Sequence, residues 1–190
     1  MDEMPERPSV EEYRARLVSA IEKGDSTSLE STANELDFYY LGPDIFPEDV
    51  FKIVMDILVR PEFAKMKGGW VLLTVFMDNR GALTKQQEQC LLDALQMIYP
   101  KFDDWMSWFY ICELLGHIAD RRALDTLSML AKIDADLPRS FVPHGLEHII
   151  ISGNNEVANA ATSLLFEMRD DPSDLVRQRV AESLHQLDKL

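Results

Sequence analysis

Two groups of polar side chains have the residue types and the spacing of metal ligands. Glu113 and His117 lie four residues apart, and His144, Glu147 and His148 follow in a second run. Helical residues four apart share one face, so each run can supply ligands to a zinc ion. The competing interpretation is a solvated polar face on otherwise apolar helices. We favour it, because HGLEH lacks the residue order of the HExxH motif, and we expect no metal and no cofactor.

Motifs for nucleophilic catalysis or phosphate binding are absent from the sequence. Cys90 and Cys112 lie among leucine, isoleucine and phenylalanine residues, where burial raises the pKa of a thiol and suppresses its reactivity. The single glycine pair, Gly68-Gly69, fits neither a dinucleotide-binding nor a Walker pattern. We therefore expect no enzymatic activity and no catalytic residue.

Negative charge dominates the composition. The 190 residues carry 33 acidic and 19 basic side chains, a formal net charge of -14 at pH 7. The excess is strongest in residues 1–62, with 15 acidic residues and 6 basic ones. Because such a field repels phosphate backbones and anionic lipid surfaces, neither nucleic acid nor a membrane is an expected partner. The sequence has only two cysteines, lacks a signal segment with a basic start and an apolar run, and has no apolar run long enough to span a membrane. These features predict a soluble cytoplasmic protein.

Apolar periodicity predicts an all-α protein of about ten helices. A capping box at Ser9 begins the first helix and Gly24 ends it. Three helices fill the first sixty residues or so, and later ones lie near residues 67–79, 104–118, 138–152 and 154–168. The Val/Ile-rich segments FKIVMDILV and EHIIISG fit strands less well, because each lies inside a longer helical period.

From residue 67 the helices recur in pairs. Aligning Met77, Leu115, Ile150 and Leu187 gives intervals of 38, 35 and 37 residues. A pair of helices cannot bury its apolar stripe alone, so successive pairs stack. We expect one domain over residues 1–190, an α-solenoid in which helical hairpins form a right-handed superhelix, with residues 1–8 as a flexible leader.

The segments ICELLGHIADRRALDTLSMLAK and SDLVRQRVAESLHQL resemble HEAT repeats of the short kind also found in phycobilisome lyases. The resemblance covers residues 67–190 and extends to residues 9–62 only through helix spacing. It implies a fold and a binding role without naming a ligand. It also implies ion pairs between repeats, each joining a turn carboxylate to an early helical arginine. The residues involved here would be Asp174 with Arg177 and Asp120 with Arg121 or Arg122.

Aromatic residues concentrate between Tyr99 and Tyr110. Such a density either fills the space between stacked hairpins or frames a pocket for a flat ligand, and we favour the core. Trp105, near a predicted helix start, is the aromatic residue most expected to be exposed.

The composition and the resemblance together predict a protein-binding module. In HEAT stacks the second helices line the concave face, and the acidic first third suits a partner with a basic patch. The specific function that we expect is that of an immunity protein, which neutralises a basic toxin such as a nuclease. Two alternatives stay open: a lyase-like or chaperone-like protein that holds a tetrapyrrole or other small ligand, and an assembly adaptor. The candidate partner-binding residues are Glu30, Glu35, Asp37, Asp44, Glu48, Asp49, Gln89, Asp93, Arg122, Asp125, Asn155 and Asn159.

Overall fold

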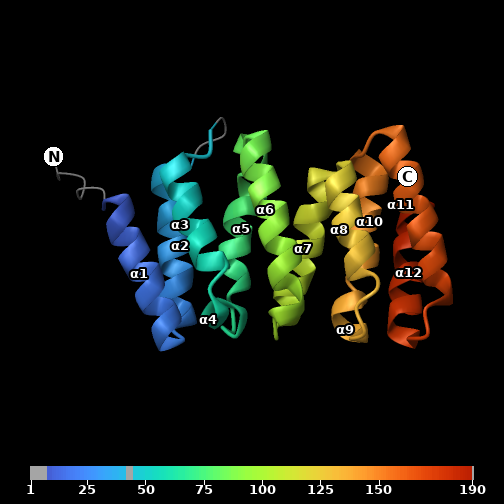
Figure 1. The fold of residues 1–190 in the computed structure, drawn as a ribbon, viewed down its shortest axis with the longest axis horizontal. Helices are drawn as coiled ribbons and strands as arrows, with labels where there is room; N and C mark the ends of the chain where they lie inside the picture. Colours follow the sequence, from blue (N-terminus) through green and yellow to red (C-terminus); the bar gives the residue numbers. More distant parts are fainter. Residues whose placement is uncertain (1–7, 42–44, 190) are drawn as a thin grey trace. The chain divides into compact units, whose positions relative to one another are not determined.

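The computed structural model describes residues 8–41 and 45–189, and this part of the chain is helical, with no β-strand (Figure 1). The all-α prediction is therefore confirmed. The described residues form twelve α-helices, and only α4 (Pro61–Ala64) and α9 (Asp136–Arg139) are as short as four residues. None of the helices found there is long and apolar enough to cross a bilayer.

The helices group into two compact units, Met1–Gln87 and Glu88–Leu190. The expected single domain stays a prediction. Nearly all of the expected leader, residues 1–7, lies outside the described residues.

In the first unit, local signals place the helix ends where the sequence predicts them. The Ser9 hydroxyl accepts a hydrogen bond from the Glu12 N–H, while the Glu12 carboxylate accepts one from the Ser9 N–H. The helix ends at Gly24, whose φ of 65° favours glycine. The helices of this unit, besides α4, are α1 (Val10–Lys23), α2 (Ser26–Tyr40), α3 (Glu48–Leu58) and α5 (Trp70–Asp78). Helix α2 packs on both α1 and α5.

The helix expected near residues 67–79 is shorter than predicted, and a separate helix precedes it. Pro61 opens α4, since its fixed φ suits a first helical position and its missing N–H has no helical partner there. Gly68 then adopts a φ of 77°, which separates α4 from α5.

The second unit stacks helical pairs. Helix α6 (Lys85–Ile98) begins before Glu88, the first residue of this unit. The other long helices of the unit are α7 (Trp105–Ile118), α8 (Arg121–Leu130), α10 (Val142–Ser152), α11 (Asn155–Glu167) and α12 (Asp174–Leu187). The first helices of successive pairs are neighbours, since α10 packs on both α7 and α12. The second helices are neighbours as well, because α11 packs on α8 and Gln96 of α6 donates a hydrogen bond to the Met129 sulfur of α8.

The prediction of a single helix over residues 138–152 is wrong. Pro138 lies inside α9, and α10 begins at Val142 with Pro143 in its first turn. A continuous helix would place Pro143 in its interior, where the ring removes a hydrogen bond and clashes with the preceding turn.

Helices α7 and α10 approach each other unusually closely. A Cβ added at Gly145 would lie 2.6 Å from the Cys112 carbonyl oxygen, and one added at Gly116 would lie 2.6 Å from the His148 Cβ. Side chains larger than hydrogen would force the helices apart at this crossing. The two glycines therefore set the separation of the side chains around them.

Aromatic residues mostly fill the core, as expected. Tyr99, Phe102 and Trp108 are buried, whereas Trp105 is 55% exposed, as predicted. Cys112 is buried, but the expectation of a buried Cys90 is wrong, because this side chain lies on the exposed side of α6.

Candidate functional site

The outer face of α2 carries a shallow groove that ends at an exposed aromatic residue. Phe38 is 79% exposed, and its ring meets the Tyr39 ring edge-on at 5.0 Å. Leu29 and Leu36 bury the opposite face of the same helix. The groove, which we call the Phe38 surface, is lined by Thr27, Glu30, Ser31, Asn34, Glu35, Phe38 and Tyr39.

The predicted acidic residues of α2 differ in their surroundings. Glu30 is exposed in the groove. Both oxygens of Glu35 accept hydrogen bonds from the Arg16 guanidinium at 2.8 Å, and these bonds lower the pKa of Glu35. Glu35 is therefore largely neutralised by α1, while Glu30 presents its charge to solvent.

Two carboxylates come close together at the ends of α2 and α5. Asp37 accepts a hydrogen bond from the Asn79 Nδ2 atom at 2.6 Å. Partial burial and the neighbouring Asp37 carboxylate raise the pKa of Asp78. Both residues lie in the last turn of their helices, where the helix dipole also disfavours negative charge. Burial is the largest cause of the raised pKa of Asp78, and the nearby Arg80 guanidinium offsets part of the repulsion from Asp37.

The other predicted acidic residues of the first unit lie at the start of α3. Glu48 pairs with Lys52 at 3.4 Å and accepts a hydrogen bond from Gln87. Asp49 accepts one from the Val50 N–H. Both carboxylates stabilise the amino end of the helix. Asp44 lies outside the described residues.

The predicted partner-binding residues on the second helices of the hairpins lie on three neighbouring helices of the second unit. Most of these residues form hydrogen bonds or ion pairs with residues close to them in the sequence. Gln89 donates a hydrogen bond to Asp93 on α6 at 2.9 Å. On α8, Asp125 pairs with Arg121 at 3.0 Å and Arg122 pairs with Asp120 at 2.8 Å. Asn155 and Asn159 are exposed on α11. The result is a polar surface of mixed sign.

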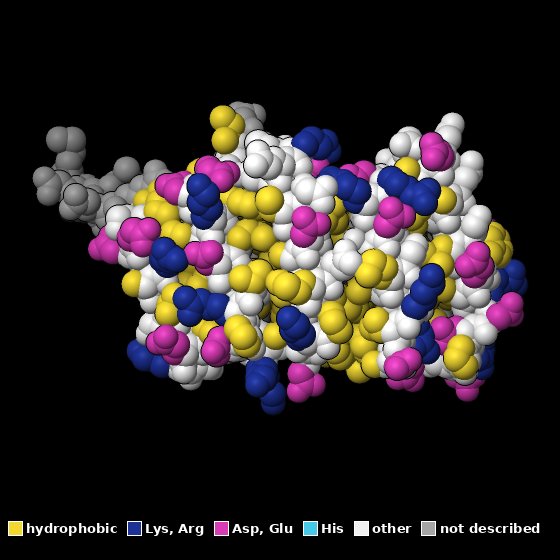
Figure 2. Space-filling view, in the orientation of Figure 1, with side chains coloured by type: hydrophobic (Ala, Val, Ile, Leu, Met, Phe, Trp, Pro, Cys, Tyr) yellow, Lys and Arg dark blue, Asp and Glu magenta, His cyan; other side chains and the backbone are white. Residues whose placement is uncertain are grey.

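Charge of both signs also covers the face drawn in Figure 2. Acidic and basic side chains are interspersed there over the helices of the first unit, with apolar side chains between them. On this face the acidic surplus does not form one continuous block.

The two sequence groups of histidine and glutamate meet at the crossing of α7 and α10. The ring centroids of His117 and His148 lie 4.4 Å apart, and the His117 Nε2 atom lies 3.8 Å from a Glu113 oxygen. One ligand atom from each of these three residues lies within 4.8 Å of the other two. All three side chains are intermediate in burial, so the predicted polar face is only partly exposed to solvent.

His144 extends this cluster towards an aromatic pocket. Its ring stacks on Phe109 at 4.7 Å and meets His148 edge-on at 4.7 Å. Burial and the neighbouring imidazoles of His148 and His117 lower the pKa of His144 to about 4. The ring borders a pocket of about 490 Å³, lined by Trp105, Phe109, Ser140, Phe141, His144, Glu147, Arg179, Glu182, Ser183 and Gln186.

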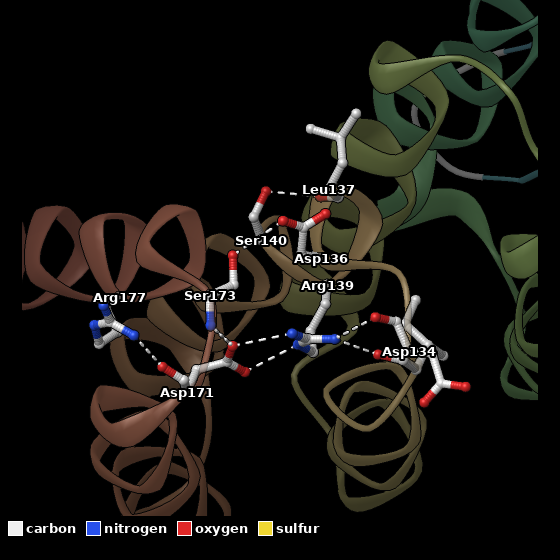
Figure 3. Close-up of polar contacts among 9 residues, drawn as sticks. Asp134, Asp136, Leu137, Arg139, Ser140, Asp171, Ser173 and Arg177 are labelled. Atoms are coloured by element: carbon white, nitrogen blue, oxygen red, sulfur yellow. Dashed lines mark hydrogen bonds and ion pairs between the residues drawn. The ribbon is translucent and has the colours of Figure 1, made fainter.

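The residues that the HEAT resemblance pairs between repeats form ion pairs, but these pairs are local and do not join repeats. Asp174 pairs with Arg177 and Asp120 with Arg122, each within one helical turn. Arg139 and Asp171 form an ion pair between distant segments of the second unit, which the sequence did not predict (Figure 3). Its only signal was an arginine beside Pro138, which did not indicate a partner 32 residues away.

Comparison with models of known protein families gives no match, and comparison with curated proteins gives none either.

Proposed function

We propose that this protein is a non-enzymatic protein-binding module that recognises a basic partner through the Phe38 surface. The observation that carries the proposal is the 79% exposure of Phe38 at the end of an acidic helix face. Exposed aromatic side chains are disproportionately the residues on which protein interfaces depend.

The charges around Phe38 favour a cationic partner. Glu30 and Asp37 are seven residues apart and share one face of α2, and Asp78 lies near Asp37. A lysine or arginine from a partner would relieve the part of the repulsion between Asp37 and Asp78 that Arg80 leaves. Opposite charge also accelerates encounter and selects the orientation of binding.

The finer form of the proposal is an acidic immunity protein of the cytoplasm that covers the active site of a basic toxin, for example a nuclease. The scaffold would be an α-solenoid, a right-handed superhelix of HEAT-like hairpins. The contacts of α7 with α10 and of α10 with α12, and the contact of α8 with α11, support repeated stacking within the second unit. An adaptor that joins other proteins would use the same surface.

The test begins with quantitative affinity capture from the native cell. We expect wild-type protein to enrich a basic protein, and Phe38→Ala and Glu30→Lys each to reduce that enrichment at least tenfold. Phe166→Ala and Glu167→Lys, which change an exposed phenylalanine and an exposed glutamate at the carboxyl end of α11, are the matched controls. Equal capture by Phe38→Ala and wild type would contradict the proposal.

Binding kinetics with the purified partner then test the role of charge. The association rate should fall as salt rises, and Glu30→Lys should weaken this dependence. Glu30 suits this experiment better than Glu48 or Asp49, because reversing those charges would also destabilise the start of α3. An association rate that does not change with salt would exclude electrostatic recognition.

A second candidate function rests on the pocket beside His144. Its aromatic lining and its volume of about 490 Å³ suit a flat small ligand such as a tetrapyrrole. Purified protein that carries a visible absorbance band would favour this function over protein binding.

A further inference from the structure

We propose that Glu113, His117 and His148 bind a divalent first-row transition metal ion, and that Zn²⁺ is the ion their donors fit best. The proposal is independent of the Phe38 surface, which lies in the other unit. The donor set is one carboxylate oxygen and two imidazole nitrogens, and the three ligand atoms lie within 4.8 Å of one another. Two histidines and one glutamate are a known zinc ligand set, which leaves a fourth position for water or another ligand.

The spacing of the donors is close to what zinc requires. Tetrahedral ligands at about 2.1 Å from zinc lie roughly 3.4 Å from one another. The His117 Nε2 atom is already 3.8 Å from the Glu113 oxygen. Because the ligand atoms lie within 4.8 Å of one another, zinc binding requires each separation to shorten by roughly 1.4 Å at most.

The backbone holds the ligands on two rigid elements. Glu113 and His117 share one face of α7, and His148 comes from α10. Gly116 precedes His117, and its Cα lies against the His148 Cβ closely enough to exclude any side chain. The α7–α10 crossing therefore places the third ligand opposite the first two.

A second observation concerns a buried nitrogen atom of the neighbouring His144. In the described part of the chain, the Nε2 atom of His144 is buried and has no hydrogen-bond partner. The His144 ring lies 4.7 Å from the His148 ring. Buried polar atoms normally have partners, and a metal ion with a water ligand would bring one into this cluster.

The chemistry of the donors also selects the class of ion. Imidazole suits Zn²⁺, Co²⁺, Ni²⁺ and Cu²⁺, whereas Mg²⁺ and Ca²⁺ prefer sites made wholly of oxygen. We therefore expect Co²⁺ to occupy the site as a spectroscopic substitute. An excess of Mg²⁺ should not displace zinc.

The experiment is a zinc titration of the full chain in competition with a chromophoric chelator. We expect one high-affinity zinc ion per chain and a rise in melting temperature when it binds. His148→Gln and Glu113→Gln should each weaken binding at least tenfold, because each removes one ligand. Glu113→Gln keeps the size of a partly exposed side chain, so it tests the site even if His148→Gln disturbs the helix crossing.

Two variants serve as controls. His185 is exposed on α12 and Cys90 is exposed on α6, and both lie outside the cluster. His185→Gln and Cys90→Ser should bind zinc as wild type does. The proposal is overturned if wild type fails to compete with the chelator, if His148→Gln and Glu113→Gln bind as tightly as wild type, or if binding is lost in either control.

Discussion

Cys112 is completely buried, and its sulfur lies 3.4 Å from the Tyr99 hydroxyl oxygen. Burial raises the pKa of the Cys112 thiol to about 12. Cys90 has the same kind of sequence neighbours, yet α6 presents it to solvent. At the scale of the residue, chemical reactivity therefore follows the helix face that a side chain occupies.

This difference predicts the number of reactive thiols. In native protein at pH 8, a disulfide reagent should modify one thiol rapidly, because Cys112 is both inaccessible and protonated. In denaturant it should modify two. Cys90→Ala should leave no rapidly reacting thiol in the native state, and rapid modification of two thiols in native wild-type protein would contradict this assignment.

At the scale of the element, one buried ion pair connects the short helix α9 to the turn before α12 (Figure 3). The side chains of Arg139 and Asp171 are each only 9% exposed, and two parallel hydrogen bonds of 2.9 and 3.0 Å join them. Burial alone would raise the pKa of Asp171, but the hydrogen bonds from Arg139 and from the Ser173 N–H outweigh it and lower the pKa. The carboxylate is therefore ionised at neutral pH.

Removing one partner should cost much more than removing both. We expect Arg139→Met to reduce the free energy of unfolding by about 3 kcal/mol, because it leaves the Asp171 charge buried without its ion-pair partner. The double variant Arg139→Met with Asp171→Leu should recover part of this loss. Arg139→Met also removes the hydrogen bonds from Arg139 to the Ile133 and Asp134 carbonyls, which the double variant cannot restore. Denaturant unfolding of the four proteins measures the coupling, and additive losses would show that the pair is not coupled.

The ion pair also makes the stability of the protein depend on acidic pH, in a direction that follows from the pKa of Asp171. The folded-state pKa of Asp171 lies below the unfolded value of about 3.9. Its contribution to stability is thus present above that pH and is lost as the pH falls through the folded pKa. Asp171→Asn should therefore lose less stability than wild type on acidification below about pH 4.

At the scale of the whole molecule, the chain separates into two compact units, Met1–Gln87 and Glu88–Leu190. The buried side chains of Leu17 on α1 and Leu146 on α10 are core residues of the first and second unit, respectively. In stacked helical pairs each element contacts mainly its neighbours, so local damage spreads over a limited distance.

Cavity-forming substitutions should therefore act within one unit. Leu17→Ala and Leu146→Ala should each cost about 2–5 kcal/mol of local stability. Hydrogen exchange should accelerate in α1–α5 for the first variant and in α7–α12 for the second. Uniform acceleration along the whole chain in both variants would instead indicate a single cooperative unit.

The positions of most helices follow from local sequence. The Ser9 capping box, Gly24 and the Asn154 cap act within a few residues of themselves, so they could be recognised without knowing the fold. The misplaced boundaries lie at Gly68 and at Pro143. At both places glycine or proline residues lie close together in the sequence, and packing decides at which of them the helix begins or ends.

Contacts between distant residues depend on the fold. His117 and His148 are 31 positions apart, and they meet because faces of α7 and α10 pack together. Arg139 and Asp171 are 32 apart, and they meet because α9 packs beside the turn before α12. The exposure of Cys90 and Phe38 has the same origin, since a helical period tells which residues share a face but not which face meets a neighbour. Local sequence thus specifies the helices of this protein, while their packing specifies its candidate sites.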